Sequence, residues 1–312
     1  MAYHSLTRNF DYFFKRLNPS PSFETKASAQ YATVKGLIED RTGPARELAP
    51  MCFLQGSYRH ETATYTINDV DIVVLCELWN PVSGGGSGRS WDRDAIFDTI
   101  AAPLRNAFFY RGKVRYHGQS MCIKLEVEPK IEILPVVYKA GNSDPNKEPF
   151  RLYRPEHSRW EDGYARYHRA HLSRKNSLSR TGNSFIPAIK VFKHLRTRYA
   201  LHSVSFHIEC LLFSLPDYLF AGGPADYIPS LLSHIAATSA SSWYAKELLT
   251  PCGERDVFTP SEWTRPEWER FHQAATRWAA TARAASQALD MATAISRWQD
   301  LLGSDFFPRY AA

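Results

Sequence analysis

The amino-acid sequence predicts an α+β protein in which N-terminal helices precede a mixed β-sheet and a helical bundle follows it. Two observations predict this order. Short apolar or alternating runs between residues 52 and 138, separated by turn-rich segments, are typical of strands. The residues before and after that region have the longer periodicity of helices, and they contain no internal repeat. In such an arrangement we expect the ligand site in the cleft between sheet and bundle.

The expected helices lie on both sides of the sheet region. A helix over 8–17 is followed by a second over 22–41, which is entered through the Asn-Pro-Ser-Pro-Ser segment. Residues 141–160, rich in Pro, Asn, Arg and Trp, are expected to form a connecting loop, and the GGGSG run at 84–88 a flexible one. The chain therefore divides into a core with the N-terminal helices, 1–160, and a helical domain, 161–312. Further helices are expected over 92–109, 162–175, 183–200, 204–220, 226–237 and 265–301.

Composition narrows the class of protein without identifying a ligand. A hydrophobic share of 44% supplies a core and excludes a disordered chain. The formal net charge of +6 is a mild bias toward polyanionic partners. The five cysteines include no CxxC pair, so neither a disulfide framework nor a thiolate zinc site is expected. Because no apolar run approaches the ~20 residues that cross a bilayer, we expect a soluble, cytoplasmic protein with no membrane partner.

Two aspartates stand at the start of the most apolar expected strand, Asn-Asp-Val-Asp-Ile-Val-Val-Leu at 68–75. Because side chains alternate along a strand, Asp69 and Asp71 share one face, with Cα atoms about 7 Å apart. Two carboxylates this close raise one pKa or require a cation, and Mg²⁺ prefers carboxylate and water oxygens. An acidic turn leading into a strand has the same pattern, so the pair alone is compatible with a metal site and with plain surface.

A second alternating run, 122–135, is expected to be one strand that presents a further carboxylate. Its odd positions are apolar and face the core, whereas its even positions are mostly charged and face the other way. An ordinary solvated sheet face is the simplest explanation. A third carboxylate beside the aspartate pair would instead complete a site for two metal ions that support phosphoryl transfer, and Glu132 is the candidate.

Small and basic residues elsewhere suit a phosphate ligand. Gly56 lets the backbone approach a ligand and Ser57 offers a hydroxyl and an amide, although Gly-Ser is also a common turn. Lys190 and Lys193 lie one turn apart on the helix 183–200, where they form either a solvated basic face or a site that neutralises a triphosphate. Ser205 stands near the start of the next helix, where it can act as a cap, a phosphate contact or a base contact.

With these residues in order, the sequence resembles the polymerase-β-like nucleotidyltransferases. Within that superfamily it resembles the cGAS/DncV-like enzymes of bacterial antiphage signalling, the CD-NTases. The motifs that carry the resemblance span roughly residues 20–220. They are GSY at 56–58, DVD at 69–71, IEILP at 131–135, VFKHLR at 191–196 and SFHIE at 205–209.

The resemblance implies a nucleotidyltransferase core at 1–160 and a catalytic role for the acidic residues. Asp69, Asp71 and Glu132 would be both the metal ligands and the catalytic residues, with Mg²⁺ or Mn²⁺ as the cofactor. Glu132 departs from the family, which usually has Asp at this position, and its side chain reaches one methylene farther.

The resemblance also implies partners and further site residues. Gly56, Ser57, Lys193 with Lys190 as second choice, and Ser205 would bind the phosphates of ATP, GTP or another ribonucleoside triphosphate. The implied product is a cyclic di- or trinucleotide second messenger, formed with release of pyrophosphate. It would act on a separate effector protein in CBASS-type antiphage signalling.

Two other functions remain compatible with the sequence. A nucleotidyltransferase of another kind would modify RNA, a protein or a small-molecule hydroxyl, and the positive charge is compatible with an RNA acceptor, although nucleic acid is not required. A non-catalytic nucleotide or nucleic-acid sensor would keep the fold without turnover, and the substitution at Glu132 favours that alternative.

Overall fold

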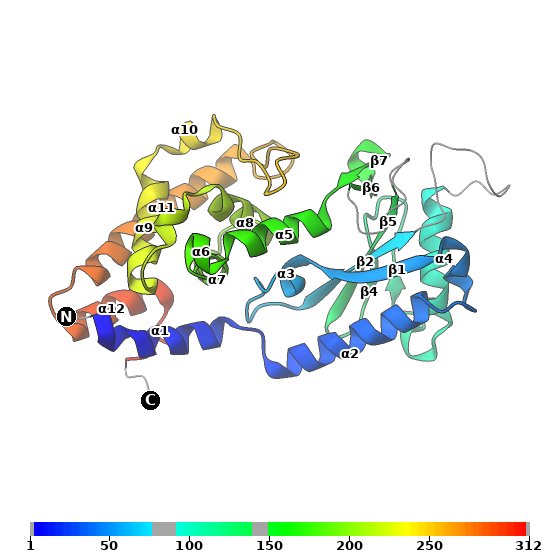
Figure 1. Cartoon of the computed structure of the whole chain (residues 1–312), viewed down its shortest axis with the longest axis horizontal. Coiled ribbons are helices and arrows are strands. Elements are labelled where there is room, and N and C mark those ends of the chain that lie inside the picture. The colour runs from blue at the N-terminus through cyan, green and yellow to red at the C-terminus, as the bar shows by residue number, and fades with distance from the viewer. Residues whose placement is uncertain (1–2, 77–91, 139–148, 310–312) are drawn as a thin grey trace. The chain divides into compact units, whose positions relative to one another are not determined.

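The computed structural model describes residues 3–76, 92–138 and 149–309, which fall into two compact units (Figure 1). The sheet unit comprises residues 20–60 and 66–167, and the helical unit comprises 1–19, 61–65 and 168–312. The expected α+β class is confirmed. The division differs from the expected boundary at 160, because the first 19 residues and the segment 61–65 group with the helices. The loop expected at 84–88 lies outside the described residues.

The strands of the described residues form one mixed, seven-stranded sheet. Its main order is β1, β2, β5, β4, β3, and β6 and β7 extend it from the C-terminal end of β5. The β2 and β5 strands run parallel, whereas the other neighbours are antiparallel. The strands are β1 (Pro50–Gln55), β2 (Asp69–Cys76), β3 (Val114–Arg115), β4 (Ile123–Leu125), β5 (Lys130–Tyr138), β6 (Phe150–Arg154) and β7 (Arg159–Gly163).

Two helices, α2 (Pro21–Ile38) and α4 (Arg93–Asn106), cover one face of this sheet (Figure 1). Each begins after a residue whose side chain accepts a backbone N–H of the first turn: Ser20 accepts from Phe23, and Asp92 from Ala95. Strand alternation decides which residues meet these helices. The larger core of the unit joins them to the sheet through Val70, Ile72, Val74, Ile123, Leu125, Ile131 and Ile133. Short helices η1 (Pro44–Leu48), α3 (Gly56–Arg59), η2 (Phe108–Tyr110) and η3 (Pro155–His157) complete the unit.

The helical unit is built around a long helix, α11 (Arg265–Ser286), which packs against α9 (Pro224–Ala237) and α12 (Met291–Leu302) (Figure 1). Buried alanines on α11 let its neighbours approach closely, and tryptophans fill the space around it. The other helices are α1 (Tyr3–Leu17), α5 (Ala165–Lys175), α6 (Leu178–Thr181), α7 (Phe185–Arg198), α8 (Ser205–Ser214), η4 (Asp217–Phe220) and α10 (Ala240–Tyr244). The first residues of α5 belong to the sheet unit.

The prediction of one continuous strand over 122–135 is wrong, because this run forms a hairpin of two strands. The run divides into β4 and β5, which pair antiparallel with Lys124 opposite Glu132. The turn contains Pro129, whose nitrogen has no hydrogen to donate to a strand ladder. Lys124 and Glu132 are therefore direct neighbours across two strands.

Two further expectations are wrong. The expected loop 141–160 contains β6 and the start of β7 in its described part, and the pair is joined by the short helix η3. The expected single helix 265–301 is two helices, α11 and α12. Asp290 is the N-cap residue of α12, and its side chain accepts the N–H of Thr293. Among the described residues, no helix has both the length and the apolarity needed to cross a membrane.

The helical unit holds a histidine whose protonation opposes folding. His207 is 5% exposed and its ring stacks on that of Trp263, with centroids 5.1 Å apart. Burial lowers the pKa of His207 from 6.5 to about 4, and the nearby carboxylate of Glu267 opposes this only in part. The folded protein therefore keeps this ring neutral at a pH where the unfolded chain takes up a proton.

The pH dependence of stability follows from this shift. The contribution of His207 is fully present above pH 6.5 and is lost as the pH falls toward 4, by up to about 3 kcal/mol. Urea unfolding between pH 4 and 7 should show this loss in the wild type, and His207→Phe should reduce its slope. An equal slope in the variant would contradict the assignment.

Candidate functional site

The two aspartates of β2 lie on the sheet face opposite the one that α2 and α4 cover. Val70, Ile72 and Val74 pack in the core under those helices, so the alternating residues Asp69 and Asp71 project to the other side. Farther along β2 this second face continues as a smaller apolar cluster with Val73 and Leu75. Both aspartates are half-buried. The strand thus carries a polar end and an apolar end on the same face.

The parallel neighbour β5 brings the third carboxylate beside them. Its pairing with β2 places Glu132 opposite Asp71, and Lys130 opposite Asp69. Neighbouring strands lie about 4.8 Å apart, and residues in register point to the same face. The face follows from packing too, because Ile131 and Ile133 on either side of Glu132 are buried in the core under the helices. We call Asp69, Asp71 and Glu132 the acidic cluster.

The surroundings of the acidic cluster shift the pKa of one of its members. Burial raises the pKa of Asp69, and the carboxylate of Glu132 raises it further. Lys130 and Lys124 act in the opposite direction, but the pKa of Asp69 remains raised. Lys124 also forms an ion pair with Glu132 at 3.3 Å, and both side chains are partly exposed. Burial, and after it the neighbouring carboxylate of Glu132, thus disfavour the ionised form of Asp69, and a bound cation would favour it.

The donor atoms of the cluster fit Mg²⁺ or Mn²⁺. The acidic cluster offers oxygen donors, which are the ligands these hard cations prefer. A soft sulfur donor stands nearby in Cys122, but burial, with a further contribution from Glu132, raises the pKa of its thiol to about 12. Cys122 is therefore protonated near neutral pH and is a poor ligand. Asp69, Asp71 and Glu132 are the residues that would hold the metal.

The glycine of the Gly-Ser pair is required by the position of Asp71. Gly56 has φ +70°, and a Cβ atom on it would lie 1.8 Å from Oδ2 of Asp71. Any side chain here would displace that carboxylate. Ser57 follows in the first turn of α3 and is half-buried. The structure thus brings five of the predicted site residues into one unit: Gly56, Ser57, Asp69, Asp71 and Glu132.

The predicted residues Lys190, Lys193 and Ser205 belong to the helical unit. Lys190 is half-buried and its Nζ donates to Oδ1 of Asn18 at 2.7 Å. Ser205 is the first residue of α8 and its hydroxyl accepts from Arg196 at 3.3 Å. The cap position before α8 is held by Val204, so Ser205 does not have the capping role that was one of its expected functions.

Lys193 has surroundings that sequence reasoning missed. The residue is 2% exposed, and its Nζ donates to Oε1 of Glu209 at 2.8 Å and to the hydroxyl and carbonyl oxygens of Thr62 at 3.0 and 3.1 Å. Burial lowers the pKa of Lys193, and Glu209 opposes that shift. In this structure Lys193 is part of a buried ion pair, which differs from the solvated or phosphate-facing side chain expected of it.

The sequence also did not predict that Lys124, Cys122 and Gln55 lie beside the acidic cluster. Lys124 and Cys122 precede Glu132 by eight and ten positions, too far to meet along a single strand. Gln55 pairs with Asp71 from the β1 side. The signal that reveals these neighbours is the hairpin turn between β4 and β5, because it folds the chain back on itself.

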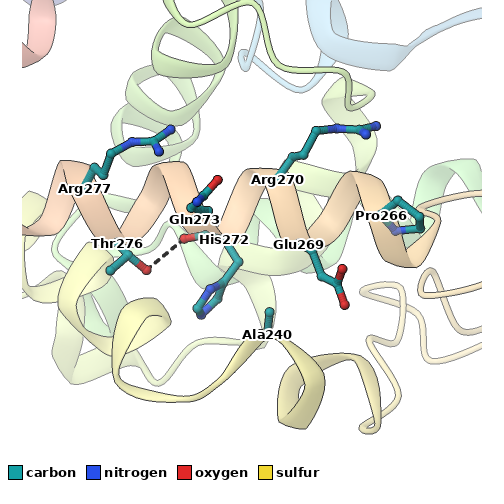
Figure 2. Close-up of a pocket in the computed structure, with 8 residues that line it drawn as sticks. All are labelled: Ala240, Pro266, Glu269, Arg270, His272, Gln273, Thr276 and Arg277. Atoms are coloured by element: carbon teal, nitrogen blue, oxygen red, sulfur yellow. Dashed lines mark hydrogen bonds between the residues drawn. The ribbon is translucent and has the colours of Figure 1, made fainter.

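The helical unit also has a surface hollow, which is lined mainly by residues of α11 (Figure 2). Figure 2 shows Arg270 and Arg277 on one side of the helix and His272 on the side of Ala240. His272 has a structural role, since its Nε2 lies 2.7 Å from the carbonyl oxygen of Thr238. Glu269 is paired with Arg265. None of the residues expected to bind nucleotide or metal lines this hollow.

Comparisons with known proteins place the fold among the nucleotidyltransferases. A cyclic UMP-AMP synthase of Rhodothermus marinus is 22% identical over 269 residues, which is 79% of this chain and 90% of the relative. The structure described as R. marinus CdnE c-UMP-AMP synthase with Apcpp and Upnpp superposes with a TM-score of 0.65 at 21% identity, covering 85% of this chain and 93% of that one. Escherichia coli MS115-1 CdnC with ATP gives a TM-score of 0.70 at 17% identity, covering 97% and 98%.

The family is indicated more narrowly by the helical unit. Residues 170–279 match the model of the cGAS/DncV-like nucleotidyltransferase C-terminal helical domain. Vibrio cholerae DncV cyclic AMP-GMP synthase, solved with a nonhydrolyzable GTP, also has this fold, with a TM-score of 0.62 at 16% identity over 96% of this chain and 79% of that one. The resemblance to the CD-NTases that the sequence motifs predict is confirmed.

Gly56 and Gly112 of the sheet unit both have a positive φ, but only at Gly56 would a side chain also meet other atoms. Gly56→Ala combines a left-handed backbone with a clash against Asp71, whereas Gly112 has φ +71° and open space around it. Gly112→Ala should cost about 1–2 kcal/mol of unfolding free energy and leave Mn²⁺ binding intact. Gly56→Ala should cost more and weaken Mn²⁺ binding about tenfold or more. Urea unfolding and titration of free Mn²⁺ by electron paramagnetic resonance measure both, and equal Mn²⁺ affinities in the two variants would contradict the role of Gly56.

Proposed function

We propose that this protein is a nucleotidyltransferase that joins ribonucleoside triphosphates into a cyclic di- or trinucleotide. The observation that carries the proposal is the convergence of Asp69, Asp71 and Glu132 on one face of the sheet, next to a glycine that the position of Asp71 requires. The likeness to cyclic nucleotide synthases supports it. The product would be a second messenger for a separate effector protein in CBASS-type antiphage signalling.

Each of the five predicted site residues in the sheet unit has a role in the proposed reaction. Gly56 allows close approach of a phosphate, and Ser57 donates its hydroxyl and N–H to phosphate oxygens. Asp69, Asp71 and Glu132 would hold Mg²⁺ or Mn²⁺, which when bound neutralises the developing charge on the phosphates. Lys190 and Ser205 of the helical unit remain candidates for contacts with the triphosphate.

The proton of the reaction needs an acceptor in the same cluster. A ribose hydroxyl oxygen of the acceptor nucleotide forms a bond to the α-phosphorus of the donor, and the bond from that phosphorus to pyrophosphate breaks. Glu132 would accept the hydroxyl proton, and its partial exposure and its position beside Asp71 support this role. A second transfer within the linear product closes the ring. The protein contributes positioning and charge complementarity more than covalent chemistry.

A non-catalytic nucleotide sensor is the second candidate function, and one observation favours it. Glu132 stands where the family usually has Asp, and it is engaged by Lys124 at 3.3 Å. Binding of ATP without release of pyrophosphate would identify a sensor. Transfer of label to RNA, a protein or a small-molecule hydroxyl would identify a nucleotidyltransferase of another class.

Incubation with all four ribonucleoside triphosphates and Mg²⁺ or Mn²⁺ tests the proposal. Phosphatase-resistant cyclic products, identified by mass spectrometry, should form together with pyrophosphate. Asp69→Asn/Asp71→Asn should lower product formation about a hundredfold or more. Glu128→Gln is the matched control, because Glu128 is 88% exposed and pairs only at the surface with Lys26. Undiminished synthesis in the double variant would refute the assigned site.

A further inference from the structure

The segment between the Gly-Ser motif and the aspartate strand is held by the helical unit. Residues 61–65 belong to that unit, whereas the residues on either side, which include Gly56, Ser57, Asp69 and Asp71, belong to the sheet unit. This anchor segment (61–65) is therefore the covalent link between two parts of the proposed site. Whatever fixes its backbone restrains both the end of the motif and the start of β2.

Buried hydrogen bonds fix Thr62 within the anchor segment. Thr62 is fully buried, and its hydroxyl donates to Oε1 of Glu209 at 2.6 Å. The Lys193 ammonium donates to that same oxygen and to both oxygens of Thr62. An ammonium has three N–H donors, and these three acceptors account for all of them. Lys193 therefore donates hydrogen bonds to the backbone carbonyl of Thr62 as well as to the side chains of Thr62 and Glu209.

The other end of the anchor segment is bound by the same helix, α7. His194 follows Lys193, and its Nε2 lies 2.8 Å from the carbonyl oxygen of Leu302, which requires a proton on Nε2. Its Nδ1 is then an acceptor, and the hydroxyl of Tyr65 donates to it at 3.3 Å. The N–H of Tyr65 also donates to the carbonyl oxygen of Leu17 at 2.8 Å. Both ends of the segment are thus hydrogen-bonded inside the helical unit.

We propose that Lys193 and Glu209 are positioning residues that act through Thr62 to restrain the chain between the Gly-Ser motif and the Asp69–Asp71 strand. In this role Lys193 does not bind the triphosphate itself. The inference rests on the proposed nucleotidyltransferase function, because it assigns the buried pair a task in that site. Loss of the grip on Thr62 lets the anchor segment move, and a displacement of about 1 Å at reacting groups is enough to reduce turnover a hundredfold.

The central experiment compares Thr62→Val with Thr62→Ser. Valine keeps the shape of threonine but lacks the hydroxyl that bonds both Lys193 and Glu209, whereas serine keeps it. We expect Thr62→Val to speed amide hydrogen exchange in residues 61–65, to weaken Mn²⁺ binding and to lower kcat about tenfold or more, with KM for the triphosphates nearly unchanged. Thr62→Ser should restore all three readouts.

Thr181→Val controls for loss of a buried hydroxyl in the same unit. The Thr181 hydroxyl donates to the carbonyl oxygen of Lys175 at 2.7 Å and lies outside the anchor segment. This variant should leave exchange in 61–65, Mn²⁺ affinity and kcat at wild-type values. Lys193→Met/Glu209→Gln, which removes both charges together, should reproduce the Thr62→Val pattern and add little to it when the three changes are combined.

Two results would overturn the inference. A Thr62→Val variant with normal exchange, Mn²⁺ affinity and kcat would show that the grip on Thr62 is dispensable. A large rise in KM for Lys193→Met, with no effect of Thr62→Val, would return Lys193 to direct triphosphate binding. If the wild type binds Mn²⁺ but forms no nucleotide product, the proposed function fails, and exchange and Mn²⁺ affinity still test the positioning role.

Discussion

The parallel register between β2 and β5 is the constraint on which the acidic cluster depends. It places Glu132 opposite Asp71, and a slip of one residue would turn Glu132 to the face covered by α2 and α4. That slip is prevented by burial, because Ile131 and Ile133 of β5 would then leave the core. The packing of aliphatic side chains under the helices therefore fixes the positions of the carboxylates on the opposite face.

Strand alternation made this part of the site predictable from the sequence. The run Asp-Val-Asp-Ile-Val assigns Asp69 and Asp71 to one face, and the alternation around Glu132 assigns its face in the same way. The hairpin was not predictable by that reasoning, since the four residues between β4 and β5 preserve the odd and even order across the turn. An unbroken pattern therefore concealed the fact that Lys124 lies beside Glu132.

The remaining failures have distinct physical causes. The β6 and β7 strands contain none of the aliphatic runs that mark β2 and β5, and they follow residues 141–149, which are rich in Pro and Asn, so a loop was expected for the whole segment. The burial of Lys193 follows helical spacing, because it lies four residues after the buried Ile189 on α7. A lysine is nonetheless expected at the surface, and the acid that compensates its charge, Glu209, is on another helix.

The buried pair of Lys193 and Glu209 is better explained by geometry than by stability. Removing two charges from water is costly, and well-packed apolar side chains often stabilise a core as well as an ion pair does. Apolar side chains cannot, however, select one orientation of a backbone carbonyl. The ammonium of Lys193 does so through directional hydrogen bonds to both oxygens of Thr62. The pair thereby fixes one orientation of Thr62 inside the helical unit, which an apolar pair of the same size would leave undefined.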